Sequence, residues 1–228
     1  MINAVFFDVD FTLIFPGPTF QAEGYRRACA EHGIIVEPAR FDAATKASSF
    51  ILDEVEDQIY SHDLFVHYTA SIIEHMGGRG EKVIEVARQI YDQWSVNHHF
   101  EMYDDVAPVL TQLSERGLII GAISNSHRSL DAFCEHFSLR GLITVSVSSA
   151  EHGYMKPHPS IFDTALKKAG VTAGESMMVG DSIAHDIEGA LAAGMRAVLL
   201  RRSGEVPPNL PAGLPVITTL SDLPPLLA

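Results

Sequence analysis

Short apolar runs that end in polar residues recur along the chain. The runs of this kind are Ala4–Phe7, 118–123, 142–147, 176–179 and 197–200. A strand of a parallel sheet is buried on both faces, so it reads as a continuous apolar run rather than as an alternation. In the second half of the chain these runs alternate with helical spacing. The pattern therefore predicts an α/β fold, with a parallel sheet flanked by helices.

Helical spacing of apolar residues dominates the stretch from 15 to 100. Apolar side chains recur there three and four residues apart, for example along 64–73 and 83–94. We therefore expect an all-helical bundle inserted after the first strand. The predicted organisation is a helical domain at 15–100 and an α/β core built from 1–14 and 101–228.

Composition and charge limit the class of protein and the partners to be expected. With 228 residues, 46% of them hydrophobic and 20% charged, the chain resembles a folded protein of one or two domains. Its net charge of -13 argues against nucleic-acid or anionic-membrane partners. Cys29 and Cys134 lack metal or redox spacing, which favours two packing residues in a reducing compartment. Without a leader pattern or a run of roughly 20 apolar residues, the expected location is cytoplasmic.

Polar side chains stand where the predicted strands end or the following helices begin. These side chains are Asp8, Asp10, Ser124, Asn125, Lys156, Asp181 and Asp186. Open α/β sheets bind their ligands outside the carboxyl ends of the strands. We therefore expect these side chains to meet over one edge of the sheet and to form a single site.

Four segments of the chain carry a family resemblance. DVDFTL, ISN, MKP and GDSIAHD resemble the four motifs of the haloacid dehalogenase (HAD) superfamily, whose members are mostly Mg²⁺-dependent phosphatases. The resemblance covers nearly the whole chain and is closest to the subfamily with a helical cap inserted after the first strand. It implies a Rossmann-like core, a mobile helical cap and a covalent aspartyl-phosphate intermediate.

The residue types suit phosphoryl transfer, in which a protein mainly positions the groups and neutralises charge. Asp8 is the candidate nucleophile, and Asp10 is placed to act first as general acid and then as general base. Ser124, Asn125 and Lys156 are the candidate phosphate ligands, and Lys156 also supplies a fixed positive charge. The free amides at the start of the helix after Ser124 would favour an anion as well.

A cation is expected among the carboxylates, because several of them around a phosphate would repel it and one another. Mg²⁺, which prefers oxygen ligands, is the natural choice. By resemblance to the family, its protein ligands would be the side chains of Asp8 and Asp181 and the backbone carbonyl of Asp10. Asp186 would hold Lys156 or a metal-bound water.

The first and last motifs depart from the family pattern at two positions. Phe11 stands where the family usually has glycine, which bears on the fold of the turn and on the space left for substrate. His185 stands where relatives commonly have asparagine. Thr12, in the same motif as Phe11, is expected to support the site.

The leading interpretation is a Mg²⁺-dependent phosphatase acting on a small phosphorylated metabolite. A phosphosugar mutase would keep all of these core residues and stays open, as does a non-catalytic binding protein on the same fold. By the family pattern, a 2-haloacid dehalogenase lacks an acid at the position of Asp10. A phosphonate-cleaving relative needs a cap lysine, for which only Lys46 and Lys82 are available. The pattern does not select an oligomeric state, a homodimer included.

Overall fold

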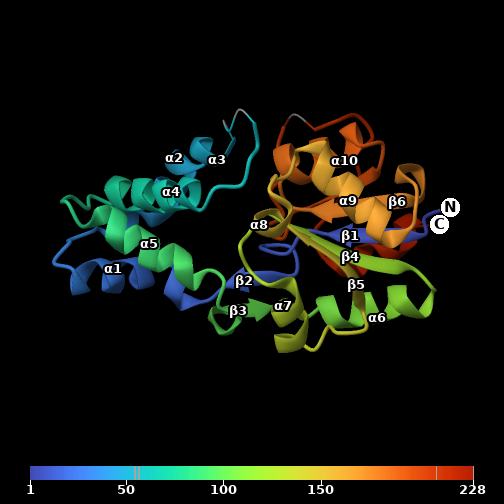
Figure 1. The fold of residues 1–228 in the computed structure, drawn as a ribbon, viewed down its shortest axis with the longest axis horizontal. Helices are drawn as coiled ribbons and strands as arrows, with labels where there is room; N and C mark the ends of the chain where they lie inside the picture. The colour runs from blue at the N-terminus through green and yellow to red at the C-terminus, as the bar shows by residue number, and fades with distance from the viewer. Residues whose placement is uncertain (54, 56, 209, 228) are drawn as a thin grey trace. The chain divides into compact units, whose positions relative to one another are not determined.

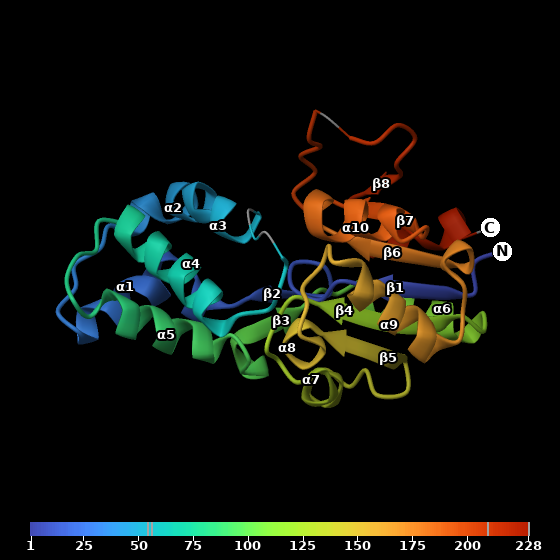
Figure 2. The same ribbon diagram turned by 45° about the horizontal axis from the view of Figure 1, so that its top comes forward.

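The apolar runs form a six-stranded sheet in which each adjacent pair of strands is parallel. Its strand order is β5-β4-β1-β6-β7-β8, part of which Figure 2 shows in sequence from β5 to β6. The strands are β1 Ala4–Phe7, β4 Ile119–Ser124, β5 Ile143–Ser148, β6 Ser176–Gly180, β7 Arg196–Leu200 and β8 Val216–Ile217. Strands β1, β4, β5, β6 and β7 each lie within one or two residues of the predicted runs, which confirms the α/β fold.

The computed structural model describes residues 1–53, 55, 57–208 and 210–227. The chain divides into two units by its internal contacts. One unit combines Met1–Phe15 with Met102–Ala228, and the other is Pro16–Glu101. The sheet belongs to the first unit, so a core is assembled from two segments separated in sequence by a helical one.

Helices cover both faces of this sheet. Helices α9 and α10 pack against each other on one face, and α6 and α7 lie on the other (Figure 1). The helices of this unit are α6 Val106–Glu115, α7 Leu130–His136, α8 Ser149–His152, α9 Pro159–Ala169 and α10 Glu188–Ala192. A short π-helical turn, Ile183–Ile187, leads into α10.

Close packing in the core depends on a glycine beside a large ring. The Phe6 side chain of β1 is fully buried and lies over Gly121 of the neighbouring strand β4. A Cβ atom at position 121 would come within 2.5 Å of the Phe6 ring. Burying a phenylalanine contributes about 1.5–3 kcal/mol, and here the contribution requires that the neighbour has no side chain.

The second unit is helical. Its helices are α1 Ala22–Glu31, α2 Phe41–Ser48, α3 Phe50–Asp53, α4 His62–His75 and α5 Val83–Gln93. Ser61 caps α4 by accepting a hydrogen bond from the Leu64 amide at 3.4 Å. The rings of Phe65 and Tyr91 stack between α4 and α5 with their centroids 5.1 Å apart. The helical bundle is present as predicted from the spacing, while its role as a cap stays a prediction.

Two short strands were not predicted from the sequence. Ile14–Pro16 (β2) and Phe100–Met102 (β3) pair as a two-stranded sheet in the segments that join the two units. Three residues are too few to show a period of two, so the sequence carries no signal for them.

Two further expectations concern the cysteines and membrane spans. Cys29 and Cys134 are buried free thiols, as their spacing predicted. Among the described residues, no helix has both the length and the apolar character required to cross a bilayer.

Candidate active site

The strand order gathers the predicted residues at the carboxyl edge of the sheet. Strand β1 lies between β4 and β6, and the three strands run parallel. Asp8 directly follows β1, Ser124 ends β4 and Asp181 directly follows β6. The Asp8 amide donates to the Val179 carbonyl at 2.9 Å, which extends the pairing of β1 with β6 to the aspartate itself. The nucleophile candidate thus has a fixed backbone.

Lys156 connects two of the carboxylates of the site. Its ammonium donates to Asp8 Oδ1 at 2.6 Å, to Asp186 Oδ1 at 2.6 Å and to the Ile123 carbonyl at 2.7 Å. These contacts engage all three of its protons, and the residue is only 2% exposed. Burial alone would lower the pKa of Lys156, but Asp186 and Asp8 more than offset that effect and raise it. The side chain is therefore a permanent positive charge.

The backbone of Lys156 is held by Asn125. The Asn125 side chain accepts from the Lys156 amide at 2.7 Å and donates to the Lys156 carbonyl at 2.9 Å. The amide oxygen and one of the two amide protons are thereby engaged, so the side chain holds the lysine segment, and its contact with phosphate stays a prediction. Helix α9 begins at Pro159, and the His158 ring caps it by accepting from the Ser160 amide at 3.2 Å.

Asp186 is placed by the π-helical turn. The wide turn is closed by a bond from the Ile187 amide to the Ser182 carbonyl at 3.2 Å. The second carboxylate oxygen of Asp186 accepts from the Ser182 amide at 3.0 Å. A Cβ atom at Gly180 would overlap this carboxylate, so the end of β6 admits only glycine. Single π turns of this kind are frequent at functional sites.

Three carboxylates form a group that could hold a cation. Oxygen atoms of Asp8, Asp181 and Asp186 all lie within 4.8 Å of one another. When all three are ionised, they leave two negative charges in excess of the single ammonium of Lys156. Burial, together with Asp186, Asp181 and Asp10, raises the pKa of Asp8 well above its usual range, although Lys156 opposes the shift. Burial and then Asp186 raise the pKa of Asp181 to about 7.

The donor set therefore fits a hard divalent cation, whose charge would balance the excess and whose preferred ligands are carboxylate oxygens. The Asp10 side chain lies outside this group. Its Oδ1 atom accepts from Nη1 of Arg128 at 2.9 Å instead. This leaves Asp10 its backbone carbonyl as the ligand that the family resemblance implies.

Arg128 is the site residue that the sequence did not reveal. It follows Ser124 by four positions, in the loop between β4 and α7, and its side chain is completely buried. Buried arginines are rare unless a carboxylate pairs with them. A basic residue in the short polar loop 125–129, next to the acidic end of β1, was the available signal.

Ser124 is buried and its hydroxyl donates to Ser126 Oγ at 3.0 Å. Helix α7 begins only at Leu130. Five loop residues separate Ser124 from this helix, and the binding of phosphate by the amides at its start stays a prediction. Any amides near this hydroxyl belong to the loop.

The turn after Asp10 is held in an unusual conformation. Phe11 has φ = 65°, in the left-handed region that suits glycine and costs another residue roughly 1–2 kcal/mol. Its amide donates to the Ile14 carbonyl at 2.6 Å. The Thr12 carbonyl accepts from Nε and Nη2 of Arg202 at 3.2 and 2.7 Å. These bonds explain how the turn forms without the glycine that the family usually has.

Thr12 contributes to the turn through its backbone. Its side chain is fully buried, and in the part of the chain that the structure describes its hydroxyl has no hydrogen-bond partner. Arg202 also forms two bonds of 3.0 Å to the Asp105 carboxylate. Asp105 in turn accepts from Thr219 Oγ1 at 2.7 Å and from the Leu220 amide at 2.8 Å. The turn is thus fastened to a residue late in the chain.

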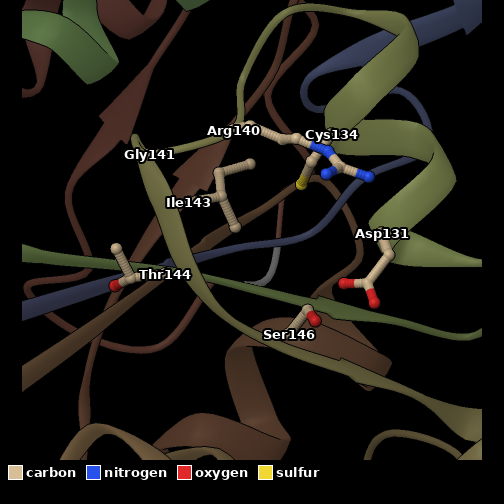
Figure 3. Close-up of a pocket in the computed structure, with 7 residues that line it drawn as sticks. All are labelled: Asp131, Cys134, Arg140, Gly141, Ile143, Thr144 and Ser146. Carbon is tan, nitrogen blue, oxygen red and sulfur yellow. The ribbon is translucent and has the colours of Figure 1, made fainter.

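A pocket elsewhere in this unit lacks the residues for catalysis. It measures about 260 Å³ and lies between α7 and the edge strand β5 (Figure 3). Its lining includes the Cys134 thiol and the Arg140 guanidinium but none of the predicted site residues. Burial raises the pKa of Cys134 to about 11, so the thiol stays protonated and unreactive. The acidic group is therefore the better candidate site.

The raised pKa of Asp181 predicts that Mg²⁺ affinity depends on pH. Below pH 7 a proton competes with the cation for this carboxylate, so affinity should rise from pH 5 to about 7 and then level off. The stability of the metal-free protein should change in the opposite direction over the same pH range. Because the folded-state pKa exceeds the usual 3.8, the Asp181 contribution to the free energy of unfolding falls as pH rises through this window.

Titration calorimetry with Mg²⁺ at several pH values, in buffers of different ionisation enthalpy, measures both the affinity and the protons released. Asp181→Asn is the matched control, and it should bind weakly and lack the part of the pH dependence that Asp181 supplies. An affinity for the unmodified chain that is constant between pH 5 and 8 would contradict the prediction.

The fold and the acidic group together define a class of protein: α/β enzymes that place carboxylates and a lysine at the carboxyl edge of a parallel sheet. Comparison with known proteins agrees. The family model of haloacid dehalogenase-like hydrolases matches residues 2–194. The chain belongs to this family and is a hydrolase.

Named relatives include phosphatases and a dehalogenase. The chain is 29% identical over 211 residues to a glyceraldehyde 3-phosphate phosphatase of Methanopyrus kandleri, covering 89% of this chain and 85% of the relative. It is 27% identical over 240 residues to the mouse (Mus musculus) N-acylneuraminate-9-phosphatase, covering 99% and 94%. A solved 2-haloacid dehalogenase from Pseudomonas syringae is 27% identical, with a TM-score of 0.66 and coverage of 100% and 98%.

Proposed function

We propose that this hydrolase is a Mg²⁺-dependent phosphatase that cleaves a small phosphorylated metabolite through an aspartyl-phosphate on Asp8. One observation carries the proposal: the carboxylates of Asp8, Asp181 and Asp186 lie within 4.8 Å of one another, while the ammonium of Lys156 pairs with only two of them, Asp8 and Asp186. Such a group suits a divalent cation and an anionic substrate together. The phosphatases among the relatives support the same reaction.

In the first step, an oxygen of Asp8 attacks phosphorus while the bond from phosphorus to the leaving oxygen breaks. That oxygen keeps the electron pair and takes a proton from Asp10. Lys156 holds the attacking carboxylate at 2.6 Å and complements the charge on the transferring group. Rotation of the Ser124 hydroxyl away from Ser126 would turn its proton toward a phosphate oxygen.

In the second step, a water oxygen attacks phosphorus and gives its proton to the Asp10 carboxylate, and the bond from Asp8 to phosphorus breaks. Phosphate leaves and Asp8 is restored. The side chains of Asp8 and Asp181 and the backbone carbonyl of Asp10 would hold Mg²⁺, which supplies positive charge against the carboxylates and the phosphate. Asp186 fixes Lys156 throughout.

Asp10 separates this proposal from dehalogenation. The attack of Asp8 on a carbon that carries a halide needs no acid for the departing halide, whereas an alkoxide needs a proton. The presence of Asp10 and of its buried partner Arg128 therefore favours phosphate esters. A mutase would use the same residues and would pass the phosphoryl group to a sugar instead of water.

The test is phosphate release from a panel of phosphate monoesters, with Mg²⁺ and with chelator. The panel includes p-nitrophenyl phosphate, glyceraldehyde 3-phosphate and N-acylneuraminate 9-phosphate, and a parallel assay measures chloride release from 2-chloropropionate. We expect Mg²⁺-dependent phosphate release and no chloride. Chloride release without phosphate release would identify a dehalogenase. Phosphoryl transfer to a sugar phosphate in preference to water would identify a mutase.

A further inference from the structure

The largest of the fully buried side chains in the described chain belongs to an arginine, Arg128. Its guanidinium is 0% exposed, and Nη1 donates to Asp10 Oδ1 at 2.9 Å. Asp10 itself is only 16% exposed. The pair joins the turn after β1 to the loop after β4. A charge of this size is withdrawn from water only where a partner compensates for the lost hydration.

The pair fixes one oxygen of the carboxylate that the proposed reaction uses twice. An aspartate side chain rotates about two bonds, and both its acid and its base roles require one oxygen to lie within hydrogen-bond distance of the reacting atom. An arginine with buried, fixed geometry removes that freedom. Lys156 cannot do the same for Asp10, because its three protons already reach Asp8, Asp186 and Ile123.

We propose that Arg128 is a positioning residue for general acid-base catalysis, which holds Asp10 Oδ1 so that the other carboxylate oxygen meets the leaving group and then the water. The inference rests on the proposed phosphatase function. It assigns to the loop between β4 and α7 a role in proton transfer, beyond the contact of Ser124 with phosphate.

Leaving groups of different basicity test this role. Loss of p-nitrophenolate from phosphorus needs little help from an acid, whereas loss of a simple alkoxide requires a proton at the same time. The ratio of kcat/KM for an alkyl phosphate to that for p-nitrophenyl phosphate therefore reports on how well Asp10 delivers its proton. A loss of general acid catalysis is expected to cost roughly 10²- to 10⁴-fold.

The experiment compares Arg128→Met and Arg128→Lys with the unmodified chain on both substrates. We expect Arg128→Met to lose about 10²-fold on the alkyl phosphate and less than about tenfold on p-nitrophenyl phosphate. Arg128→Lys, which restores a donor, should recover part of the alkyl activity. Exposed Arg140, which pairs with Glu135 at 2.9 Å, gives the control Arg140→Met, with both activities unchanged.

A double-mutant cycle with Asp10→Asn tests whether Arg128 acts through Asp10. If Arg128 acts through Asp10, adding Arg128→Met to Asp10→Asn should change the substrate ratio no further. Thermal unfolding and Mg²⁺ titration of each variant identify any that fails to fold, in which case Arg128→Lys and Arg128→Gln complete the comparison.

Equal losses on the two substrates, or losses that add to those of Asp10→Asn, would overturn the positioning role and indicate that Arg128 binds phosphate or only supports the fold. In that result the unmodified chain still hydrolyses the panel, so the proposed function stands. An unmodified chain without phosphatase activity would instead overturn both the positioning role and the proposed function.

Discussion

Asp8→Asn is expected to abolish phosphate release, with kcat lowered by at least roughly 10³-fold. The amide oxygen of the asparagine can still accept from Lys156, so the site should keep its shape. The amide nitrogen cannot attack phosphorus as a carboxylate does. The measurement is phosphate release under saturating Mg²⁺, together with acid-quenched incorporation of labelled phosphate, which should appear with the unmodified chain and not with the variant.

The fold of this variant should survive, because a neutral side chain beside Asp181 and Asp186 removes repulsion as well as an ion pair. Its thermal unfolding in chelator is expected to match or exceed that of the unmodified chain. Asp104→Asn, a change at an exposed aspartate outside the site, is the matched control and should leave activity intact. Retention of a tenth or more of the activity in Asp8→Asn would exclude the covalent intermediate.

Lys156→Met is expected to lower the free energy of unfolding of the metal-free protein by about 3–5 kcal/mol at neutral pH. The substitution keeps the volume of the side chain but leaves Asp8 and Asp186 without their common cation. It also leaves the buried Ile123 carbonyl without its donor. An unpaired buried carboxylate has a raised pKa, so protonation relieves the defect, and the deficit should shrink as pH falls toward 5.

Urea unfolding in chelator at pH 7 and pH 5 measures both effects. Lys168→Met is the control: its ammonium donates to the Ser146 carbonyl at 2.9 Å from an exposed position, and its loss should cost less than about 0.5 kcal/mol. A deficit below about 1 kcal/mol for Lys156→Met, or one that grows as pH falls, would show that the lysine does not neutralise this group.

Much of the α/β core was predictable because its signals are local. The strand before Asp8 is a continuous apolar run, and parallel topology then brings Asp8, Ser124 and Asp181 to one edge whatever lies between them. The same argument placed Lys156 and Asp186 near that edge. The two-stranded sheet of β2 and β3 carries no such signal, because its strands are only three residues long.

Contacts between distant loops were not predictable. Arg128 reaches Asp10 across 118 positions, and no spacing rule relates two residues that far apart. The Asn125 side chain was expected to face phosphate, and only the structure shows that it holds Lys156. The left-handed Phe11 is a third case, since the bonds that hold its turn include one from Arg202 to Thr12.

The bond from Arg202 to the Thr12 carbonyl determines how late in synthesis the turn after Asp10 can be stabilised. It joins positions 190 residues apart, and Asp105 extends the connection to Thr219 and Leu220. The ribosome makes Asp8 and Asp10 well before Arg202, so the turn that follows them gains these supports only after residue 220 has emerged. A growing chain therefore contains Asp8 and Asp10 long before it can fix their positions. The site can be completed only after residue 220 has been synthesised.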